Sequence, residues 1–454
     1  MKMIYDVEDK PKFGQMLIFA IQQLLAIMTA TLVVPVVVNQ ATGSLMSSAA
    51  ALVGAGIGTL VYILFTKKKS PVFLGSSFAF IGSMITAFAG AASMSLGYLG
   101  LIIGALFAAL VYVIIAVIVK FAGVKWINKI MPVTVIGPIV AIIGLSLAGN
   151  AIGDITKGSV PDVAASPLIT VLCGIITLIV TIISSSYSKK IGRLIPFIFG
   201  ILAGYAASGL FTIIGYSANI DALKVLNVEP FKALVANGVT LSTFLSVPEF
   251  TFMNVSEGFK VLDWTYISTI AVAYVPVAFV VFAEHLADHK NISSIIERDL
   301  LENPGLHRTL LGDGIGSFVG ALFGGCPNTT YGESVGCVAI TKNASVATIF
   351  TAAILAIIIA FISPFIAFVN SIPSCVMGGV CMALYGFIAV SGLKMIQQVD
   401  LNQNKNLFVV STILISGIGG LTLTIGKVTL TAVACSLILG IIVNLILSKA
   451  KDAE

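Results

Sequence analysis

The chain has 454 residues, of which 58% are hydrophobic and only 10% charged, and its formal net charge is +5. A soluble globular protein carries about 25% charged residues, so this composition excludes an ordinary soluble domain. Apolar runs of about 20 residues recur along the whole length and predict a polytopic α-helical protein embedded in a lipid bilayer. The basic residues stand between these runs, so we attribute the positive charge to membrane topology and expect no nucleic-acid partner.

In chain order, the apolar runs predict about fourteen spans. The first seven lie near residues 13–38, 46–66, 76–90, 98–120, 130–149, 166–184 and 195–214. The second seven lie near residues 265–288, 310–324, 328–341, 346–370, 373–391, 405–422 and 428–448. The third and the tenth are too short to cross the bilayer as uninterrupted helices, because crossing takes about 20 residues.

Basic residues follow every even-numbered span. They are Lys67, Lys68, Lys69, Lys120, Lys125, Lys129, Lys189, Lys190, Arg193, Lys290, Arg298, Arg308, Lys342, Lys394, Lys405, Lys449 and Lys451. Because lysine and arginine collect in cytoplasmic connections, both termini are predicted to be cytoplasmic. We therefore expect a multi-pass protein of the cytoplasmic (cell) membrane.

Two fragments of the chain resemble each other at a distance of seven spans. One is MPVTVIGPIVAIIGLSLAG (131–149) in the fifth span, and the other is IPSCVMGGVCMALYGFIAVSG (372–392) in the twelfth. The shared positions are Pro132 with Pro373, Val135 with Val376, and Gly137 with Gly378. An odd number of spans per repeat turns the second copy upside down. The predicted fold class is therefore an all-α membrane protein of two inverted seven-span repeats, an arrangement common among secondary transporters.

Two interrupted segments occupy corresponding positions in the two repeats. PVFLGSSFAFIG (71–82) lies in the third span and PNTTYGESVG (327–336) in the tenth. Non-helical backbone at membrane depth is tolerated only where protein or a wet cavity satisfies its N–H and C=O groups. We expect the two segments to meet at the centre and to pair as short strands. The half-helices after them would then present backbone amides to a small polar ligand.

Three carboxylates stand in segments that otherwise have the composition of membrane spans: Glu284, Asp288 and Glu333. A charge at bilayer depth costs at least about 2.5 kcal/mol on the insertion scale, so such groups face a protein interior or a wet cavity. Glu284 and Asp288 are spaced i,i+4 and therefore share one face of a helix. Neighbouring carboxylates in such a site are suited to loading and releasing a proton. The sequence thus predicts the binding and coupling site of a transporter.

Five motifs become specific when they are taken together. They are QQLLAIMTATLVVP (22–35), GSSFAF (75–80), AEH (283–285) with an acidic residue at 288, NPGLHR (303–308) and PNTTYGE (327–333). Together they resemble the uracil permease branch of the nucleobase–ascorbate transporter family, and the similarity covers nearly the whole chain. The resemblance implies a fourteen-span fold with core and gate domains. It also implies proton-coupled uptake of a nucleobase and a homodimer.

The resemblance implies domain boundaries as well. The core domain would comprise residues 13–120 and 264–370. The gate domain would comprise residues 130–214 and 372–448 and would support dimerisation. Independently of the resemblance, the charge-based topology places residues 215–263 outside the cell, and their aromatic and apolar content predicts an ordered connection between the two halves.

Site residues follow from the resemblance by position. The side chains of Glu284 and Glu333 would hydrogen-bond the base, and the backbone at Phe78 and Gly332 would donate to its carbonyl oxygens. The pocket would also be lined by Ala30, Tyr331 and Tyr385. The chemistry agrees, because a pyrimidine dione offers ring N–H donors and carbonyl acceptors in one plane. Ionised carboxylates only accept and backbone amides only donate, so together they complement that edge.

Two positions depart from the uracil branch. Asp288 stands where uracil permeases usually place His, and an acidic residue there is more typical of the xanthine branch. Ser334 stands where Asn is common. Xanthine carriers, however, usually place Gln at the position of Glu333, so uracil stays ahead of xanthine or another purine base. We assign the coupled proton to Asp288 with Glu333, and the anchoring of the ligand to Glu284.

Other classes of function fit less well. An anion exchanger of similar fold would need Arg or Lys at the centre, where this chain has carboxylates. An intramembrane enzyme would need catalytic groups within the spans, so we do not expect an enzyme. No metal or other cofactor is expected, since the six cysteines form no metal-type spacing with histidine.

The remaining polar residues near these motifs are given structural roles. His285 is expected to have a satisfied packing or loop role. His289 and His307 are expected to be solvated at the cytoplasmic exit. Asp313 is expected to cap the start of the ninth span at the membrane interface.

Overall fold

The computed structural model describes residues 3–123, 126, 132–161, 163–189, 195–236, 238–425 and 428–447. Six basic residues of the topology argument lie outside the described residues: Lys125, Lys129, Lys190, Arg193, Lys449 and Lys451. The described chain is predominantly helical, and eight of its helices are long and apolar enough to cross a membrane. This confirms the expected all-α polytopic class.

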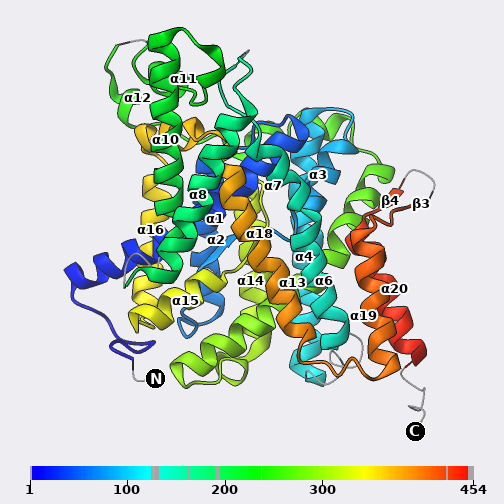
Figure 1. Ribbon diagram of the computed structural model, residues 1–454. Coiled ribbons are helices and arrows are strands. Elements are labelled where there is room, and N and C mark those ends of the chain that lie inside the picture. The colour runs from blue at the N-terminus through cyan, green and yellow to red at the C-terminus, as the bar shows by residue number, and fades with distance from the viewer. Residues whose placement is uncertain are drawn as a thin grey trace.

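The first repeat runs from α1 to α10 (Figure 1). Its third span is a short strand followed by a half-helix, and its fifth is a pair of consecutive helices. The elements are α1 (Phe13–Thr42), α2 (Ser48–Phe65), β1 (Leu74–Ser76), α3 (Ile81–Ala89), α4 (Met94–Ala122), α6 (Val133–Ser146), α7 (Ala148–Ile155), α8 (Pro167–Tyr187) and α10 (Pro196–Ala218).

The second repeat runs from α13 to α20 and again has a strand and a half-helix in its third span. A π-helical turn (Leu301–Gly305) precedes its second helix. The elements are α13 (Trp264–Ile296), α14 (Leu306–Gly324), β2 (Asn328–Thr330), α15 (Gly332–Thr341), α16 (Val346–Ile359), α17 (Ser363–Ser371), α18 (Ser374–Ile396), α19 (Asn404–Ile418), β3 (Leu423–Ile425), β4 (Val428–Leu430) and α20 (Ala432–Leu447).

The connection between the repeats folds at one end of the molecule, opposite the end that holds both chain termini (Figure 1). It contains short helices and 3₁₀ turns: the turn Asp221–Leu223, α11 (Glu229–Val235), α12 (Leu241–Phe244), and the turns Thr251–Asn254 and Gly258–Lys260. Its last residue, Asp263, caps α13 by accepting a hydrogen bond from the N–H of Tyr266 at 2.7 Å.

Three span boundaries differ from those predicted. The eleventh span is divided into two helices, α16 and α17. Pro364 lies in the first turn of α17, where its missing N–H breaks the helical hydrogen-bond pattern. Between the two helices, the carbonyl of Phe361 accepts a hydrogen bond from the N–H of Ser246 in the connection, at 3.0 Å. The eighth span continues two turns beyond residue 288, since Ile292 and Ile296 keep one face of α13 buried. The fourteenth does not begin as a helix, because residues 428–430 pair with β3 in a hairpin.

The internal repeat is visible in the packing of α6 and α18. Pro132 and Pro373 each precede the first residue of their helix in an extended conformation. A Cβ on Gly378 would lie 2.6 Å from the backbone N of Ile155, and one on Gly137 would lie 3.1 Å from the backbone N of Ile396. The repeated glycines therefore sit where another helix passes close by, in both copies.

The predicted strand pair is also confirmed. β1 and β2 are antiparallel, with Leu74 opposite Thr330, Gly75 opposite Thr329 and Ser76 opposite Asn328. Only glycine fits at position 75, because a Cβ there would lie 2.4 Å from the ring of Tyr331. The strands thus join the third span of one repeat to the third span of the other.

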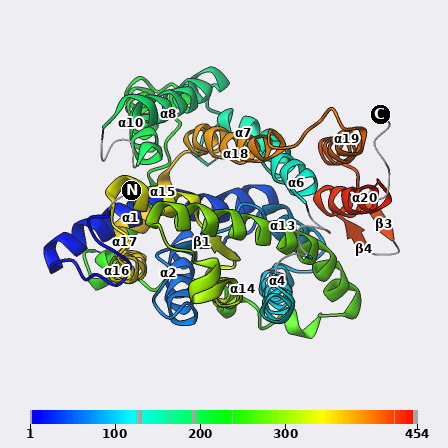
Figure 2. The ribbon, with the colours of Figure 1, turned by 90° about the horizontal axis from the view of Figure 1, so that it is seen from below.

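The helices separate into two groups (Figure 2). α6, α7, α8, α10, α18 and α19 lie in one row, and α1, α2, α4, α13, α14 and α16 lie in a block beside it, with β1 inside the block. α13 is the helix of the block that packs against α6 and α20. The fold therefore consists of a core and a gate built from both repeats.

Candidate functional site

A cavity of about 440 Å³ lies where the interrupted segments face the gate helices. Its core side comes from the ends of β1 and β2, the starts of α3 and α15, and one face of α13. Its gate side comes from α6 and α18. The lining residues are Ser77, Phe78, Ala79, Val140, Ile143, Glu284, Ala287, Asp288, Thr329, Thr330, Tyr331, Gly332, Glu333, Leu384, Phe387, Ile388, Ser391 and Met395.

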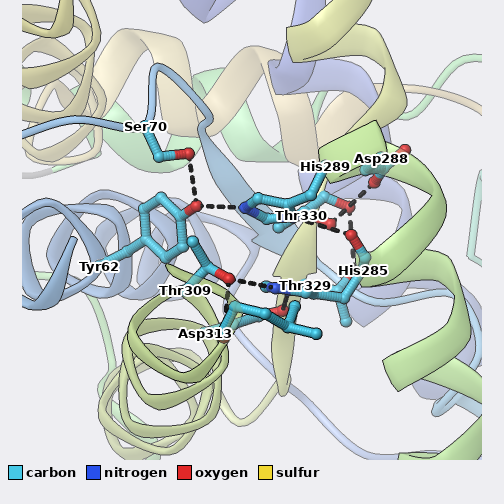
Figure 3. Close-up of polar contacts among 10 residues, drawn as sticks. Tyr62, Ser70, His285, Asp288, His289, Thr309, Asp313, Thr329 and Thr330 are labelled. Atoms are coloured by element: carbon cyan, nitrogen blue, oxygen red, sulfur yellow. Dashed lines mark hydrogen bonds and ion pairs between the residues drawn. The ribbon is translucent and has the colours of Figure 1, made fainter. Parts of the chain in front are cut away.

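All three carboxylates predicted from the sequence line this cavity. Glu284 and Asp288 lie on one face of α13, and Glu333 lies in the first turn of α15. Each is partly exposed. Asp288 Oδ2 accepts a hydrogen bond from Thr330 Oγ1 at 2.8 Å (Figure 3). The cavity therefore contains acceptor oxygens that can still receive hydrogen bonds from a ligand.

The backbone amides of Phe78 and Gly332 belong to residues that line the same cavity. Gly332 is the first residue of α15, whereas Phe78 lies in the turn that leads into α3, two residues before the N-cap Phe80. The first N–H groups of a helix have no acceptor within that helix. Within the described chain, the N–H groups of Phe78 and Gly332 have no hydrogen-bond partner. The helix dipoles add partial positive charge at these ends. Donors and acceptors thus face one space.

The aromatic residues assigned to the site divide into two kinds. Phe78 and Tyr331 line the cavity, and the hydroxyl of Tyr331 donates to the carbonyl of Ser76 at 2.6 Å, which leaves its ring for contacts. Tyr385 lies behind the lining, with its ring edge against Phe78 at a centroid distance of 6.1 Å. Ala30 is buried in α1 and does not line the cavity either.

The gate-side lining was not predicted from the sequence. Leu384, Ile388, Ser391 and Met395 follow one another at the spacing of a helix face. That stripe is present in the sequence, but its apolar members look the same as residues that face lipid. Only the packing of α18 against the core distinguishes the two surfaces.

A neighbouring face of α13, about 100° around the helix, is buried in protein (Figure 3). His285 Nδ1 lies 2.6 Å from Asp313 Oδ2, and His285 Nε2 lies 3.0 Å from Thr309 Oγ1. Thr309 donates its own hydrogen to the carbonyl of Leu306 at 3.0 Å, so its oxygen accepts from His285 Nε2–H. One further proton is therefore shared between His285 Nδ1 and Asp313 Oδ2.

The second buried histidine has its protons fixed in the same way. His289 Nδ1 lies 2.8 Å from the carbonyl oxygen of His285 and must donate to it. When neutral, its Nε2 accepts from the hydroxyl of Tyr62 at 2.6 Å, and that hydroxyl accepts from Ser70 at 2.7 Å. The two imidazole rings stack at a centroid distance of 4.0 Å. These residues hold α13 against α2 and α14.

Two expectations for these residues were wrong. His289 is not solvated but fully buried, because α13 continues past residue 288 and turns this side chain toward Tyr62 of α2. Asp313 does not cap a helix, because it lies inside α14 with 1% of its surface exposed and pairs with His285. His285 has the satisfied packing role that was expected, and His307 is half-buried at the start of α14.

The cavity extends toward one end of the molecule. Its lining on α18 comes from the C-terminal half, which is nearer the end that holds both termini (Figure 1). At the other end of α18, Gln40 Nε2 of α1 donates to Ser374 Oγ at 3.2 Å. This hydrogen bond joins core to gate on the side away from the termini.

The lining also limits the kind of ligand. No lysine or arginine is among the described residues that line the cavity. In the described ranges, no group of His, Cys, Asp and Glu is arranged to hold a metal ion. Partly exposed carboxylates, free amides and an aromatic ring suit a small planar ligand with both donors and acceptors.

Comparisons with curated proteins place the chain among permeases. The uracil permease of Bacillus caldolyticus is 38% identical over 98% of this chain and 95% of its own length. The uracil permease of Bacillus subtilis (strain 168) is 36% identical over 99% and 96%, and that of Escherichia coli (strain K12) is 35% identical over 97% and 93%. These relatives are transporters and not enzymes, as expected.

Solved structures show the same fold at low sequence identity. The transmembrane domain of the cyanobacterial bicarbonate transporter BicA has a TM-score of 0.61 at 13% identity and covers 96% of this chain and 99% of its own. Murine Slc26a9, an anion transporter in the inward-facing state, has a TM-score of 0.59 at 12% identity and covers 97% and 69%. Residues 14–426 match the model of the Permease family, and the chain belongs to that family.

Proposed function

We propose that this protein imports uracil together with protons by alternating access. The observation that carries the proposal is the content of one cavity. It is lined by partly exposed carboxylates and by two residues, at or just before a half-helix, whose amides have no partner among the described residues. The names of the relatives from Bacillus and Escherichia support uracil as the substrate. The cavity volume of about 440 Å³ lies within the usual range for small-molecule sites.

The base binds with its polar edges between the core elements. Glu284 and Glu333 accept hydrogen bonds from the ring N–H groups, and the backbone N–H groups of Phe78 and Gly332 donate to the carbonyl oxygens. The ring of Phe78 covers one face of the base. Tyr331, which directly follows β2, lines the pocket next to Thr330. Ala30 and Tyr385 support the pocket from behind, Tyr385 through its contact with Phe78.

The coupled proton is carried by Asp288 together with Glu333. Both carboxylates line the cavity, so a proton can reach them by the same route as the substrate. Thr330 holds Asp288 in place by donating to it at 2.8 Å, and it can do so whether or not the carboxyl is protonated. Loading the proton before the base removes one negative charge from the site, which lowers the cost of moving the site through the membrane interior.

Transport requires movement of the core against the gate. We assign residues 13–120 and 264–370 to the moving core, and residues 130–214 and 372–448 to a gate that also forms the homodimer contact. The connection 215–263 lies on the extracellular side, and both termini lie in the cytoplasm. In this arrangement the cavity opens to the cytoplasm, and the Gln40–Ser374 hydrogen bond belongs to the closed extracellular side.

A purine base such as xanthine is the second candidate. It is favoured by Asp288, one of the two residues at which this chain departs from the uracil branch. The relatives named uracil permease weigh against it. The same uptake experiment distinguishes the two substrates.

The test is uptake of radiolabelled uracil and, in parallel, of radiolabelled xanthine by cells that lack their own permeases. Unlabelled xanthine is added as competitor in the uracil assay, and Glu333→Gln is measured alongside. The substitution removes one charge-assisted hydrogen bond, which costs about 1.5–3 kcal/mol, so we expect uptake to fall about ten- to a hundredfold. Glu257→Gln is the matched control, since Glu257 is exposed on the connection and, within the described ranges, pairs only with Lys260, at 2.7 Å.

The possible outcomes separate the candidates. Uptake of uracil that is insensitive to xanthine and lost only in Glu333→Gln supports the proposal. Uptake of xanthine without uptake of uracil assigns the site to a purine base. An equal loss in both variants, with normal amounts of protein in the membrane, removes Glu333 from the site.

A further inference from the structure

A second, much smaller cavity lies inside the core, away from the substrate cavity. Its volume is about 10 Å³, close to that of a single water-sized sphere. It lies between α4, α14 and β2, and Phe80 and Val281 close it on the side of α13. The lining residues are Phe80, Ala108, Ala109, Tyr112, Val281, Asp313, Gly314, Ser317 and Asn328.

Three polar oxygens of the lining residues have no hydrogen-bond partner in the described chain. They are the hydroxyl of Tyr112, Oδ1 of Asp313 and Oδ1 of Asn328, and all three side chains are buried. A buried polar atom without a partner costs about 1–3 kcal/mol. Three such atoms around one small cavity indicate that a small polar ligand satisfies them together.

We propose that this cavity holds one structural water molecule. The water donates its two hydrogens to Asp313 Oδ1 and Asn328 Oδ1 and accepts the hydroxyl hydrogen of Tyr112. The orientation of the Asn328 amide is fixed, because its Nδ2 donates to the carbonyl of Gly54 at 3.0 Å and so leaves Oδ1 as the acceptor. Buried waters typically make about three hydrogen bonds, which is the number of partners here.

A sodium ion fits this site less well than water. A cation needs oxygen lone pairs from every side, and the rest of this cavity is walled mainly by Phe80, Ala108, Ala109 and Val281. The hydroxyl of Tyr112 would also have to turn its hydrogen away from the ion, and no described acceptor lies within reach of it. Water uses the hydroxyl as a donor and avoids both costs.

The water extends the buried network to the strand that carries the site. Asp313 already pairs with His285 on α13, and Tyr112 packs its ring edge against His285 at 6.1 Å. Through the water, both are joined to Asn328, the first residue of β2. β2 leads directly to Thr330 and Glu333. The water therefore fixes the strand on which part of the substrate cavity is built.

The experiment compares two tyrosines whose buried hydroxyls both lack a hydrogen-bond partner among the described residues. Tyr112 lines the small cavity, whereas Tyr274 does not and instead stacks on Phe80 at 5.5 Å. Tyr112→Phe removes a donor to the water and is expected to lower the melting temperature of the purified protein. Tyr274→Phe removes a hydroxyl that has no partner in the described part of the chain and does not line the small cavity, so its melting temperature is expected to stay equal or to rise.

Two further measurements locate the effect and identify the ligand. Amide hydrogen exchange of residues 328–341 is expected to accelerate in Tyr112→Phe and to stay unchanged in Tyr274→Phe. A crystal structure that resolves ordered waters, determined in sodium buffer and in choline buffer, is expected to show the same density peak within hydrogen-bond distance of all three oxygens.

Other results overturn the proposal. A peak that appears only in sodium buffer, together with a melting temperature raised by sodium, replaces the water with a cation. An absent peak, or a Tyr112→Phe variant as stable as the wild type, means that the three oxygens have no shared ligand.

Discussion

Helix α13 has two polar faces of opposite character. On one face, Glu284 and Asp288 are partly exposed to the substrate cavity, and of the two only Asp288 receives a hydrogen bond within the described chain, from Thr330. On the other face, His285 and His289 are buried, and all four ring nitrogens have partners. The residues of the two faces alternate along one stretch of six residues, 284–289.

The difference separates groups that hold the fold from groups that are open to a ligand. Burying a polar group is costly unless it is hydrogen-bonded, so the histidines stay buried only because protein atoms satisfy them. The carboxylates avoid that cost by facing a cavity. A substitution on the buried face should therefore act on stability, and one on the cavity face should act on transport.

The largest effect is expected for His285→Leu. It leaves the Asp313 carboxyl buried without its partner, and breaking a buried pair in this way costs about 3–5 kcal/mol. We expect a much lower melting temperature and a reduced yield of folded protein in detergent. Glu284→Gln, one residue away on the cavity face, is the control and is expected to unfold at nearly the wild-type temperature.

The double variant His285→Leu/Asp313→Leu sharpens this test. Removing both partners leaves no uncompensated buried charge, so much of the lost stability is expected to return. If His285→Leu and Glu284→Gln unfold at the same temperature, the two faces do not differ in the way proposed.

The next largest effect is expected for Asp288→Asn and concerns coupling. If the carboxyl must be protonated for uptake, wild-type uptake rises as the external pH falls, by about tenfold between about pH 8 and about pH 5.5. An amide cannot titrate, so the variant should take up uracil at a rate that does not depend on external pH. Thr330 can still donate to the amide oxygen, so we expect the protein to remain folded.

Measurement of proton entry together with uracil entry checks the coupling directly. In proteoliposomes loaded with a pH-sensitive dye, the wild type should acidify the interior when uracil is added outside, and Asp288→Asn should not. Acidification by the variant at the wild-type rate assigns the proton to another group.

Much of the fold followed from the sequence. The apolar runs predicted the spans, and the Gly-, Ser- and Thr-rich segments at 71–82 and 327–336 predicted the strand pair that the structure shows. These features are local, because a span needs length and apolar composition, and an interruption needs residues that disfavour helix. The carboxylates could be predicted because they too are a local feature: a charged residue within an apolar run is visible in the sequence alone.

The buried face of α13 could not be found in this way. His289 lies beyond the apolar run, so the sequence gives no sign that it is covered by Tyr62. Asp313 pairs with His285 across 28 residues of chain, and no local pattern encodes that contact. Gate residues such as Ile388 were missed because lipid-facing and cavity-facing apolar side chains look alike until helices are packed.

The smallest expected effect comes from making one substitution on each face. Thr309→Val removes the acceptor of His285 Nε2–H in a buried site, and Thr330→Val removes a donor to Asp288 at the edge of the cavity. The first leaves a buried donor unpaired and should cost about 1 kcal/mol or somewhat more. The second leaves an acceptor that water in the cavity can reach, so stability should change by less than about 0.5 kcal/mol. Urea or thermal unfolding of both variants in the same detergent measures the difference. Both variants replace threonine by valine, so any difference between them comes from the site. An equal loss of stability in both would show that burial does not separate the two faces. A loss of stability confined to Thr309→Val would assign the buried face to stability.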